Sequence, residues 1–381
     1  MSTNSVSLSP TGDPWLLTPG PLTTSPEVKQ AMLHDFGSRD HDFINVNRRV
    51  REELAALVDG NGAYTCVPLQ GSGTFVVEAM LGTLVPPGGK ALVLVNGAYG
   101  QRIAKILDYH GRAKVVQECP ENEPVDSQRL AQALADDADI THVVAVHCET
   151  TTGILNPLKE VADTVAAAGR KLLIDAMSAF GVIELKASDL QFDAVAASSN
   201  KCLQGTPGMG FCIARKGALE TCEGNSPSLS LDLYDQWMAM EKSAQWRFTP
   251  PVQVIAAFGK ALEEYQAEGG QPGRLARYRE NCRILIDGME RMGFQPLLPE
   301  NLQAPIIVTF MMPDNPKFEF QAFYDSLKDK GFVIYPGKLT IADTFRIGCI
   351  GALGREQMEA ALDAIQLTLD EMGVALLSPA A

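Results

Sequence analysis

Short apolar runs alternate with longer segments of helical spacing between about residues 26 and 215. The runs are rich in β-branched residues and predict strands at 90–95, 113–117, 141–147, 171–175, 193–198 and 211–214. Apolar positions three and four residues apart predict helices at 28–32, 50–58, 75–81, 101–110 and 158–168. Strands separated by helices of this length favour parallel βαβ units, so we expect an α/β fold with a mainly parallel sheet covered on both faces. Ligands of such sheets bind at the carboxyl ends of the strands.

The pattern changes beyond about residue 258. Two helices are predicted first, at 254–266 and 274–292, and the remaining pattern predicts strands at 305–310, 331–335 and 345–348 and helices at 320–330 and 355–372. This mixture is typical of a smaller α+β domain. A chain of 381 residues is longer than one hydrophobic core usually serves. We therefore expect an amino-terminal arm (1–25), a large domain (26–258) and a small carboxyl-terminal domain (259–381).

Composition and charge exclude several classes of protein function. The net charge of −14 gives a surface that repels nucleic acid and anionic lipid. No apolar run reaches the roughly 18 residues that span a membrane, and the amino terminus lacks the features of a signal peptide. The eight cysteines form no CxxC pair and the five histidines no metal-binding pattern. We therefore expect a cytoplasmic protein with reduced thiols, and with no membrane, nucleic-acid or metal partner.

A turn of small residues, Gly71-Ser72-Gly73-Thr74, precedes the helix predicted from residue 75. Small residues at a helix start expose backbone N–H groups, and the positive end of the helix dipole favours phosphate. The same four residues would equally suit an ordinary helix cap. They do not match the GxGxxG spacing of a dinucleotide site.

Two charged residues stand near strand ends. Asp175 closes the strand at 171–175, where a carboxylate serves either as a helix cap or as a ligand for a cationic group. Lys201, after Ser198-Ser199-Asn200, is expected to end a strand just before a Gly/Pro-rich reversal, although a surface lysine would also fit. A phosphate cradle, an aspartate and a lysine on one sheet together suit pyridoxal 5'-phosphate. Lys201 would bind that cofactor covalently, and Asp175 would pair with the pyridinium nitrogen and keep the ring an electron sink.

At these motifs the chain resembles the class V aminotransferases, which are pyridoxal-phosphate enzymes of fold type I. The resemblance runs from about residue 16 to 351, and several of its motifs look specific to one branch. That branch moves the amino group of 2-aminoethylphosphonate to pyruvate, giving phosphonoacetaldehyde and L-alanine in phosphonate breakdown. The segments that carry it are LLTPGPLTT (16–24), LQGSGT (69–74), NGAYG (96–100), HCETTTGILNP (147–157), IDAMSAFG (174–181), NKCLQGTPG (200–208), SLSLDLY (228–234), QWRFTPP (245–251) and FVIYPGK (332–338).

The resemblance implies roles for further residues around the cofactor. Tyr99 would stack on the ring, although without the family a core aromatic is an equal reading. Thr150 would bind the phenolic oxygen of the ring. The phosphate would be bound by the backbone and hydroxyls of Ser72, Gly73, Thr74 and Ser199.

The same resemblance implies a homodimer with shared active sites. Thr249 would bind the phosphate of the neighbouring subunit's cofactor, with Trp246 nearby. Arg346 would bind the substrate, and its own sequence context agrees, because an arginine between apolar residues of a strand needs an anionic partner. Arg39 departs from the pattern of the phosphonate branch, where an aromatic residue is expected. It is either a substrate contact or a surface arginine paired with Asp40 or Asp42.

Three rival functions remain to be separated. An alanine–glyoxylate or serine-type aminotransferase would use the same machinery with a different amino donor. A cysteine desulfurase would want a histidine on the ring and a cysteine in a mobile loop, whereas this chain has Tyr99 and a Cys349 that we expect in a strand. A non-catalytic regulator would need an added DNA-binding domain or a lost lysine, and we find neither.

Overall fold

The computed structural model describes residues 8–59, 61–337, 339 and 342–376. Lys338, the last residue of the FVIYPGK motif, lies outside the described residues. So do residues 1–7 of the expected arm and 377–381 at the carboxyl end.

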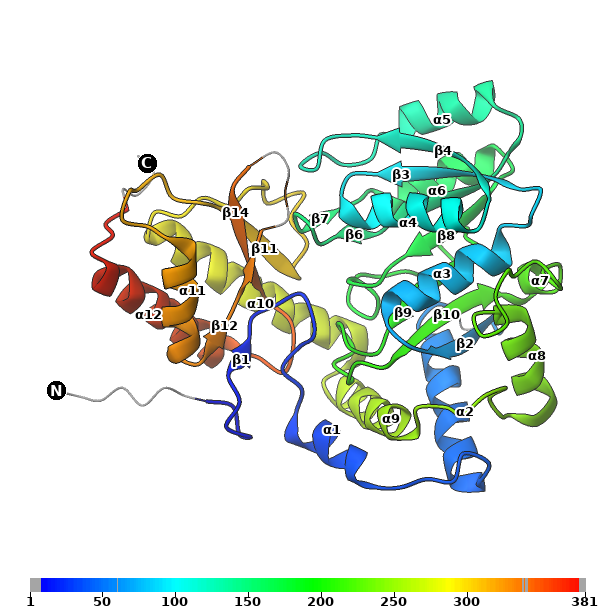
Figure 1. The fold of residues 1–381 in the computed structure, drawn as a ribbon, viewed down its shortest axis with the longest axis horizontal. Helices are drawn as coiled ribbons and strands as arrows, with labels where there is room; N and C mark the ends of the chain where they lie inside the picture. The colour runs from blue at the N-terminus through cyan, green and yellow to red at the C-terminus, as the bar shows by residue number, and fades with distance from the viewer. Residues whose placement is uncertain (1–7, 60, 338, 340–341, 377–381) are drawn as a thin grey trace.

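A seven-stranded sheet forms the centre of the larger part of the molecule (Figure 1). Its strand order is β2-β10-β9-β8-β5-β3-β4. Only β10 runs antiparallel to its neighbours, and the other pairs are parallel, so the expected mainly parallel sheet is confirmed. In chain order the strands are β2 (Tyr64–Gln70), β3 (Lys90–Val95), β4 (Ala113–Glu118), β5 (Ile140–Val146), β8 (Lys171–Asp175), β9 (Ala194–Ser198) and β10 (Met209–Arg215).

Helices cover both faces of this sheet, because every central strand is apolar on both sides. One core forms beneath α2 (His41–Ala56), α5 (Ser127–Asp136), α6 (Leu158–Ala167) and α9 (Val252–Ala267). The core on the other face forms beneath α3 (Gly73–Leu84), α4 (Ala98–Tyr109), α7 (Lys216–Leu219) and α8 (Leu233–Ser243). The short helices α1 (Pro26–Gln30) and η1 (Ala31–Leu33) precede α2.

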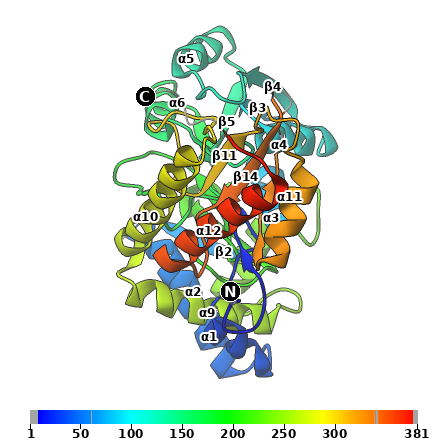
Figure 2. The ribbon, with the colours of Figure 1, turned by 90° about the vertical axis from the view of Figure 1, so that its left-hand side faces the viewer.

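The carboxyl-terminal part has its own sheet and its own core. The three-stranded sheet has the order β11-β14-β13 and is antiparallel. Figure 2 looks onto the helices that flank it. The elements are α10 (Gly270–Arg291), β11 (Ile307–Met311), α11 (Phe320–Asp329), β12 (Phe332–Val333), β13 (Tyr335–Pro336), β14 (Thr344–Gly348) and α12 (Arg355–Met372).

The amino-terminal segment joins this second part. Strand β1 (Trp15–Leu16) pairs in parallel with β12, and the Gly348 N–H at the end of β14 donates to the Leu17 carbonyl. At the other junction, α9 runs through the expected boundary at residue 258. Its buried residues on both sides of that position belong to the core of the large sheet.

Several details differ from the expected elements. Strand β2 and helices α5 and α8 were not anticipated. The strand expected at 331–335 is split, because β12 pairs with β1 whereas β13 pairs with β14. Cys349 lies one residue beyond the end of β14 rather than within a strand, and it is fully buried.

The described residues include neither a membrane-spanning helix nor a metal-binding cluster. No helix among them combines the length and the apolar character that a membrane span requires. No group of His, Cys, Asp or Glu side chains among them is arranged to hold a metal ion.

Candidate active site

A cavity of about 460 Å³ lies beside Lys201, between the ends of the central strands and the starts of α3 and α4. Its walls include the turn at 71–74, Tyr99 and Lys201, which lie far apart in the sequence. Asp175 closes β8, which is adjacent to β9 in the sheet. The carboxyl ends of parallel strands meet at one edge, where such folds bind their ligands.

Lys201 lies three residues past the end of β9, in a turn rather than at the strand end itself. Its Nζ donates to the Pro19 carbonyl at 2.6 Å. Gly20 follows with φ of +120°, and a Cβ there would lie 2.6 Å from the same Nζ. The amino-terminal segment therefore lies directly against the lysine.

Asp175 is buried at the end of β8. Its Oδ1 accepts a hydrogen bond from the Met177 N–H at 2.9 Å. Burial raises the pKa of Asp175 to about 6, although the Met177 N–H and the charges of Arg102 and Lys201 act in the opposite direction. A carboxylate in such surroundings gains most from a cationic partner.

The start of α3 forms the cradle expected from the sequence. Ser72 is the N-cap, and its hydroxyl makes no capping hydrogen bond. Gly73 packs so closely that a Cβ there would lie 2.4 Å from the Met177 sulfur. Backbone N–H groups at this start point away from the helix and favour an anion.

Arg102 also lines the cavity, although no sequence motif had singled it out. Its Nη1 donates to Thr74 Oγ1 at 3.0 Å. The guanidinium carbon lies 4.9 Å from the centre of the Tyr99 ring. Because Tyr99 and Arg102 are three residues apart on α4, helical spacing could have revealed this pairing.

Ser198 closes β9, Ser199 follows it directly, and their side chains differ in position. The Ser199 hydroxyl donates to the Thr206 carbonyl at 2.6 Å and also lies 3.1 Å from the Met209 carbonyl. The expected phosphate contact of Ser199 does not match this geometry. Ser198 lines the cavity instead, and its buried hydroxyl has no partner among the described residues. A shift of one residue turns the side chain to the opposite side of a strand, which the motif alone does not reveal.

The Thr150 turn lies next to Arg346. Arg346 on β14 is fully buried, and its Nη1 donates to the Thr150 carbonyl at 2.8 Å. Its Nε donates to the Pro336 carbonyl at 3.1 Å, and no carboxylate in the described part of the chain forms an ion pair with it. Burial lowers the pKa of Arg346. The buried Thr150 hydroxyl likewise has no described partner. An uncompensated guanidinium is costly inside a protein, so this position suits an anionic ligand.

Glu149, inside the same motif, was not singled out from the sequence. It is fully buried, and its carboxylate accepts hydrogen bonds from the Tyr99 and Thr151 N–H groups, each at 3.1 Å. Burial raises the pKa of Glu149, and these hydrogen bonds oppose that shift. Glu149 therefore ties the start of α4, which carries Tyr99, to the Thr150 turn.

Seven predicted site residues are not among those that line the Lys201 cavity: Asp175, Thr150, Ser199, Arg346, Thr249, Trp246 and Arg39. Thr249 and Trp246 line a separate cavity of about 470 Å³ that shares Gly71 with the first. Trp246 Nε1 also donates to the Asn47 side chain at 3.0 Å. Arg39 is exposed in the turn before α2 and lines neither of these two cavities. The described residues show no ion pair between Arg39 and Asp40 or Asp42.

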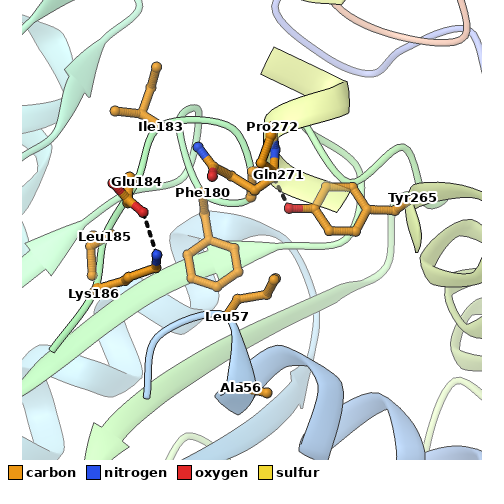
Figure 3. Close-up of a pocket in the computed structure, with 11 residues that line it drawn as sticks. Ala56, Leu57, Phe180, Ile183, Glu184, Leu185, Lys186, Tyr265, Gln271 and Pro272 are labelled. Carbon is orange, nitrogen blue, oxygen red and sulfur yellow. Dashed lines mark hydrogen bonds and ion pairs between the residues drawn. The ribbon is translucent and has the colours of Figure 1, made fainter. Parts of the chain in front are cut away.

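A third cavity, of about 270 Å³, lies between the end of α2, the 180–186 loop and the α9–α10 junction (Figure 3). The Phe180 and Leu57 side chains face it, and a Glu184–Lys186 ion pair of 2.6 Å lies at one side. The Tyr265 hydroxyl donates to the Gly181 carbonyl at 2.7 Å. None of the predicted site residues lines this cavity.

The Lys201 cavity fits pyridoxal phosphate in three respects. The start of α3 provides N–H groups for a phosphate, and the unpartnered Ser198 hydroxyl lies in the same cavity. The buried Asp175 suits a pyridinium nitrogen, because burial disfavours its charged form and a cationic partner would compensate that cost. The unpartnered Thr150 hydroxyl is available to a phenolic oxygen.

Comparisons with known proteins agree with this chemistry. Residues 27–331 match the family model described as aminotransferase class-V. A 2-aminoethylphosphonate–pyruvate transaminase from Pseudomonas entomophila is 53% identical over 361 residues, covering 95% of this chain and 98% of the relative. A 2-aminoethylphosphonate–pyruvate transaminase 2 from Burkholderia lata is 54% identical and covers 95% and 96%.

A solved structure with the same fold is the alanine–glyoxylate aminotransferase from a Nostoc species. It superimposes with a TM-score of 0.87 at 23% identity, covering 95% of this chain and 97% of that one. At this identity the likeness concerns the fold alone.

Proposed function

The chain belongs to the class-V aminotransferases, and on that premise we propose that it transfers the amino group of 2-aminoethylphosphonate to pyruvate. The products are phosphonoacetaldehyde and L-alanine. The observation that carries the proposal is the identity of 53% over 95% of the chain to a relative that is named for this reaction. Arg346 is buried and donates to two backbone carbonyls, but no carboxylate among the described residues pairs with it. This arrangement supports the proposal that the substrate is an anion.

The cofactor is pyridoxal phosphate, which supplies an electron sink for the carbon that carries the amino group. We assign its covalent attachment to Lys201 and its pyridinium partner to Asp175. The start of α3, with Ser72, Gly73 and Thr74, would bind the phosphate. Tyr99 and Thr150 would contact the ring, and Ser198 would take the place that the sequence analysis gave to Ser199.

Lys201 also acts on the substrate proton. With the cofactor bound, the Lys201 Nζ would take the proton from the amino-bearing carbon of the donor and pass it to the cofactor. Asp175 would hold the ring nitrogen, and a positive charge there would lower the pKa of Asp175 from the value that burial sets. The contact between Lys201 and the Pro19 carbonyl would be exchanged for contacts with the substrate.

Arg346 binds the acidic group of each substrate in turn, first the phosphonate and then the carboxylate of pyruvate. Its planar fork of N–H donors matches both groups. The Thr150 carbonyl accepts from Nη1 and the Pro336 carbonyl accepts from Nε, and these two bonds hold the guanidinium in place. The rest of the guanidinium remains for the ligand.

The enzyme is proposed to act as a homodimer with shared sites. Phe75 and Phe248 are about half exposed and line the same cavity as Thr249. Large apolar side chains rarely stay exposed around a hollow unless a partner covers them. In the dimer Thr249 would reach the partner's cofactor phosphate, and Trp246 and Arg39 would lie near the substrate.

The cytoplasm is the proposed location. All eight cysteines are free, and seven of them are buried. Thiols persist in this form in a reducing compartment.

A spectroscopic experiment tests the proposed reaction. Purified protein loaded with pyridoxal phosphate is mixed with 2-aminoethylphosphonate without any acceptor, and the cofactor absorbance is followed. We expect conversion to the amine form, and pyruvate added next should restore the first spectrum and yield L-alanine. L-Alanine with glyoxylate and L-serine serve as comparison substrates, and Lys201→Ala serves as the inactive control. Faster conversion with L-serine than with 2-aminoethylphosphonate would overturn the assignment of the donor.

A further inference from the structure

A buried arginine on α10 contacts the turn that carries Lys201. Arg274 is 1% exposed, and its Nη1 donates to the carbonyl of Cys202, the residue after Lys201, at 2.6 Å. Its Nε forms an ion pair with Glu268 at 2.6 Å. Neither the cavity beside Lys201 nor the chemistry described above uses this side chain.

Arg274 lies in surroundings where a buried charge is energetically unfavourable. The guanidinium carbon lies 5.2 Å from the ring centre of Tyr265 and 5.9 Å from that of Tyr278. Figure 3 shows Tyr265 at the end of α9, beside the loop that follows β8. Arg274 also lies in the second turn of α10, near the end where the helix dipole disfavours a cation. A buried ion pair adds little stability compared with well-packed apolar residues, so a role beyond packing is indicated.

The turn that Arg274 contacts has a backbone conformation that needs support. Gln204 has φ of +59°, in the left-handed region that residues other than glycine rarely adopt. The turn closes on itself through the Gln204 N–H to the Lys201 carbonyl and the Gly205 N–H to the Ser199 carbonyl, each at 2.8 Å. From outside the turn, the Gln204 side-chain amide is held by the Tyr278 hydroxyl and by the Gly351 carbonyl.

The same face of α10 also fixes the loop after Arg346. Gly351 lies five residues beyond Arg346, and its N–H donates to the Tyr278 hydroxyl at 3.1 Å. Arg277, one helical turn from Arg274, donates to the Gly351 carbonyl at 2.7 Å. α10 therefore joins the turn of the lysine to the loop of the substrate arginine.

We propose that Arg274 is a positioning residue which, together with Tyr278, sets the placement of Lys201 relative to Arg346. One small substrate must meet both groups, the proton-transferring Nζ at one end and the guanidinium at the other. A displacement of about 1 Å between such groups can lower the rate a hundredfold. The inference rests on the proposed roles of Lys201 and Arg346.

Three variants test this role. Arg274→Lys keeps the charge but cannot reach both the Cys202 carbonyl and Glu268 in the same planar geometry. Tyr278→Phe keeps the ring and removes the hydroxyl that joins Gln204 to Gly351. Arg283→Lys is the control on the same helix, because Arg283 pairs with Glu280 and Asp287 and has no hydrogen bond, among the described residues, with residues 199–205 or with the loop after Arg346.

Two measurements separate positioning from general stability. In the loaded enzyme we expect Arg274→Lys and Tyr278→Phe to lower kcat by about ten- to a hundredfold, with KM changed less than about threefold. In the cofactor-free protein we expect faster backbone hydrogen exchange in residues 199–206, with exchange in the central strands unchanged. Arg283→Lys should leave both kcat and exchange in 199–206 at the wild-type values.

The outcomes that overturn the inference are distinct from those that overturn the proposed function. Wild-type kcat in both Arg274→Lys and Tyr278→Phe, or faster exchange throughout the molecule, would show that these side chains serve stability alone. Wild-type protein that cannot use 2-aminoethylphosphonate would contradict the proposed function instead. The exchange measurement would still report on the turn in that case.

Discussion

At the residue scale, the site concentrates ionisable groups where the protein interior penalises them. Asp175 and Arg346 are almost fully buried, and no ion pair involving either is found among the described residues. Burial of these charges is unfavourable, and a ligand group of the opposite charge would offset that cost. The cofactor and substrate proposed above carry the complementary groups: a cationic ring nitrogen and an acidic substrate group.

Replacement of Asp175 by Asn is expected to stabilise the cofactor-free protein while abolishing function. The pKa of Asp175 rises from about 3.9 in the unfolded chain to about 6 in the folded one. The folded protein thus holds a proton that the unfolded chain has released, so the free energy of unfolding falls as pH rises from about 4 to 6. The resulting decrease in the free energy of unfolding is at most about 3 kcal/mol at pH 7. An asparagine at this position does not ionise and so avoids this decrease.

The measurement is chemical denaturation of both cofactor-free proteins at pH 4, 5, 6 and 7. Burial lowers the pKa values of His142 and His147 to about 4, so these histidines make the free energy of unfolding rise with pH in both proteins. Their contribution cancels when the free energy of unfolding of one protein is subtracted from that of the other. Wild type should become progressively less stable than Asp175→Asn up to pH 6, and the variant should lose at least about a hundredfold in kcat/KM. A difference that does not change with pH would contradict the burial argument.

At the element scale, the start of α3 is both the expected anion site and the place where the Gly73 backbone lies closely against the Met177 side chain. Gly73 faces the Met177 side chain, and the Met177 N–H holds Asp175. The cradle and the aspartate are thereby linked through one residue. A side chain at position 73 would push Met177 and disturb both.

We expect Gly73→Ala to weaken cofactor binding by about ten- to a hundredfold, the effect of 1–3 kcal/mol of overpacking. Its Cβ would lie within 2.4–2.9 Å of three atoms of Met177. Met177→Ala removes those atoms, so the double variant should bind the cofactor more tightly than Gly73→Ala alone. Titration of the cofactor-free proteins with pyridoxal phosphate gives the Kd values. Equal Kd values for Gly73→Ala and the double variant would place the effect in the backbone of the turn.

At the scale of the whole molecule, the site depends on both sheets and, as proposed, on two chains. Lys201 and Asp175 come from the large sheet, and Arg346 comes from the three-stranded sheet. The Thr249 cavity adjoins the Lys201 cavity at Gly71 but opens beside exposed aromatic side chains. A twofold partner that covers them would complete each site with residues of the other chain.

Mixing two inactive variants tests this arrangement. In a dimer of Lys201→Ala and Thr249→Asp chains, one site receives the intact lysine of one chain and the intact threonine of the other. Both substitutions fall in the second site. After full exchange of subunits, about a quarter of the wild-type activity should return. Mixtures in which exchange is verified by mass but activity stays absent would show that Thr249 serves its own chain.

The sequence revealed the elements of the sheet better than the contacts between them. Apolar runs such as 90–95 and 171–175 became β3 and β8 at the expected residues, because a buried parallel strand leaves a continuous apolar signal. Strand β2 escaped notice, because Pro68 interrupts its pattern. At the site, the motifs located the Lys201 turn and the cradle. They did not reveal Glu149 or Arg274, whose contacts form only between segments that are distant in the sequence. Arg102 was not singled out either, although its spacing from Tyr99 on α4 predicts their contact.

The contact between Pro19 and Lys201 has a consequence for the synthesis of the protein. Residues 15–17 reach their place by pairing with Phe332–Val333 and with Gly348, so this early segment waits for almost the last part of the chain. At translation rates of 5–20 residues per second, the interval between them is on the order of 15–60 s. The pairing that holds residues 15–17, and with them Pro19 beside Lys201, therefore requires β12 and β14 to have been synthesised. A chain that ends before β12 lacks the strand that pairs with residues 15–16, so the Pro19 carbonyl would not be held against Lys201. The contact between Pro19 and Lys201 thus distinguishes a nearly full-length chain from a truncated one.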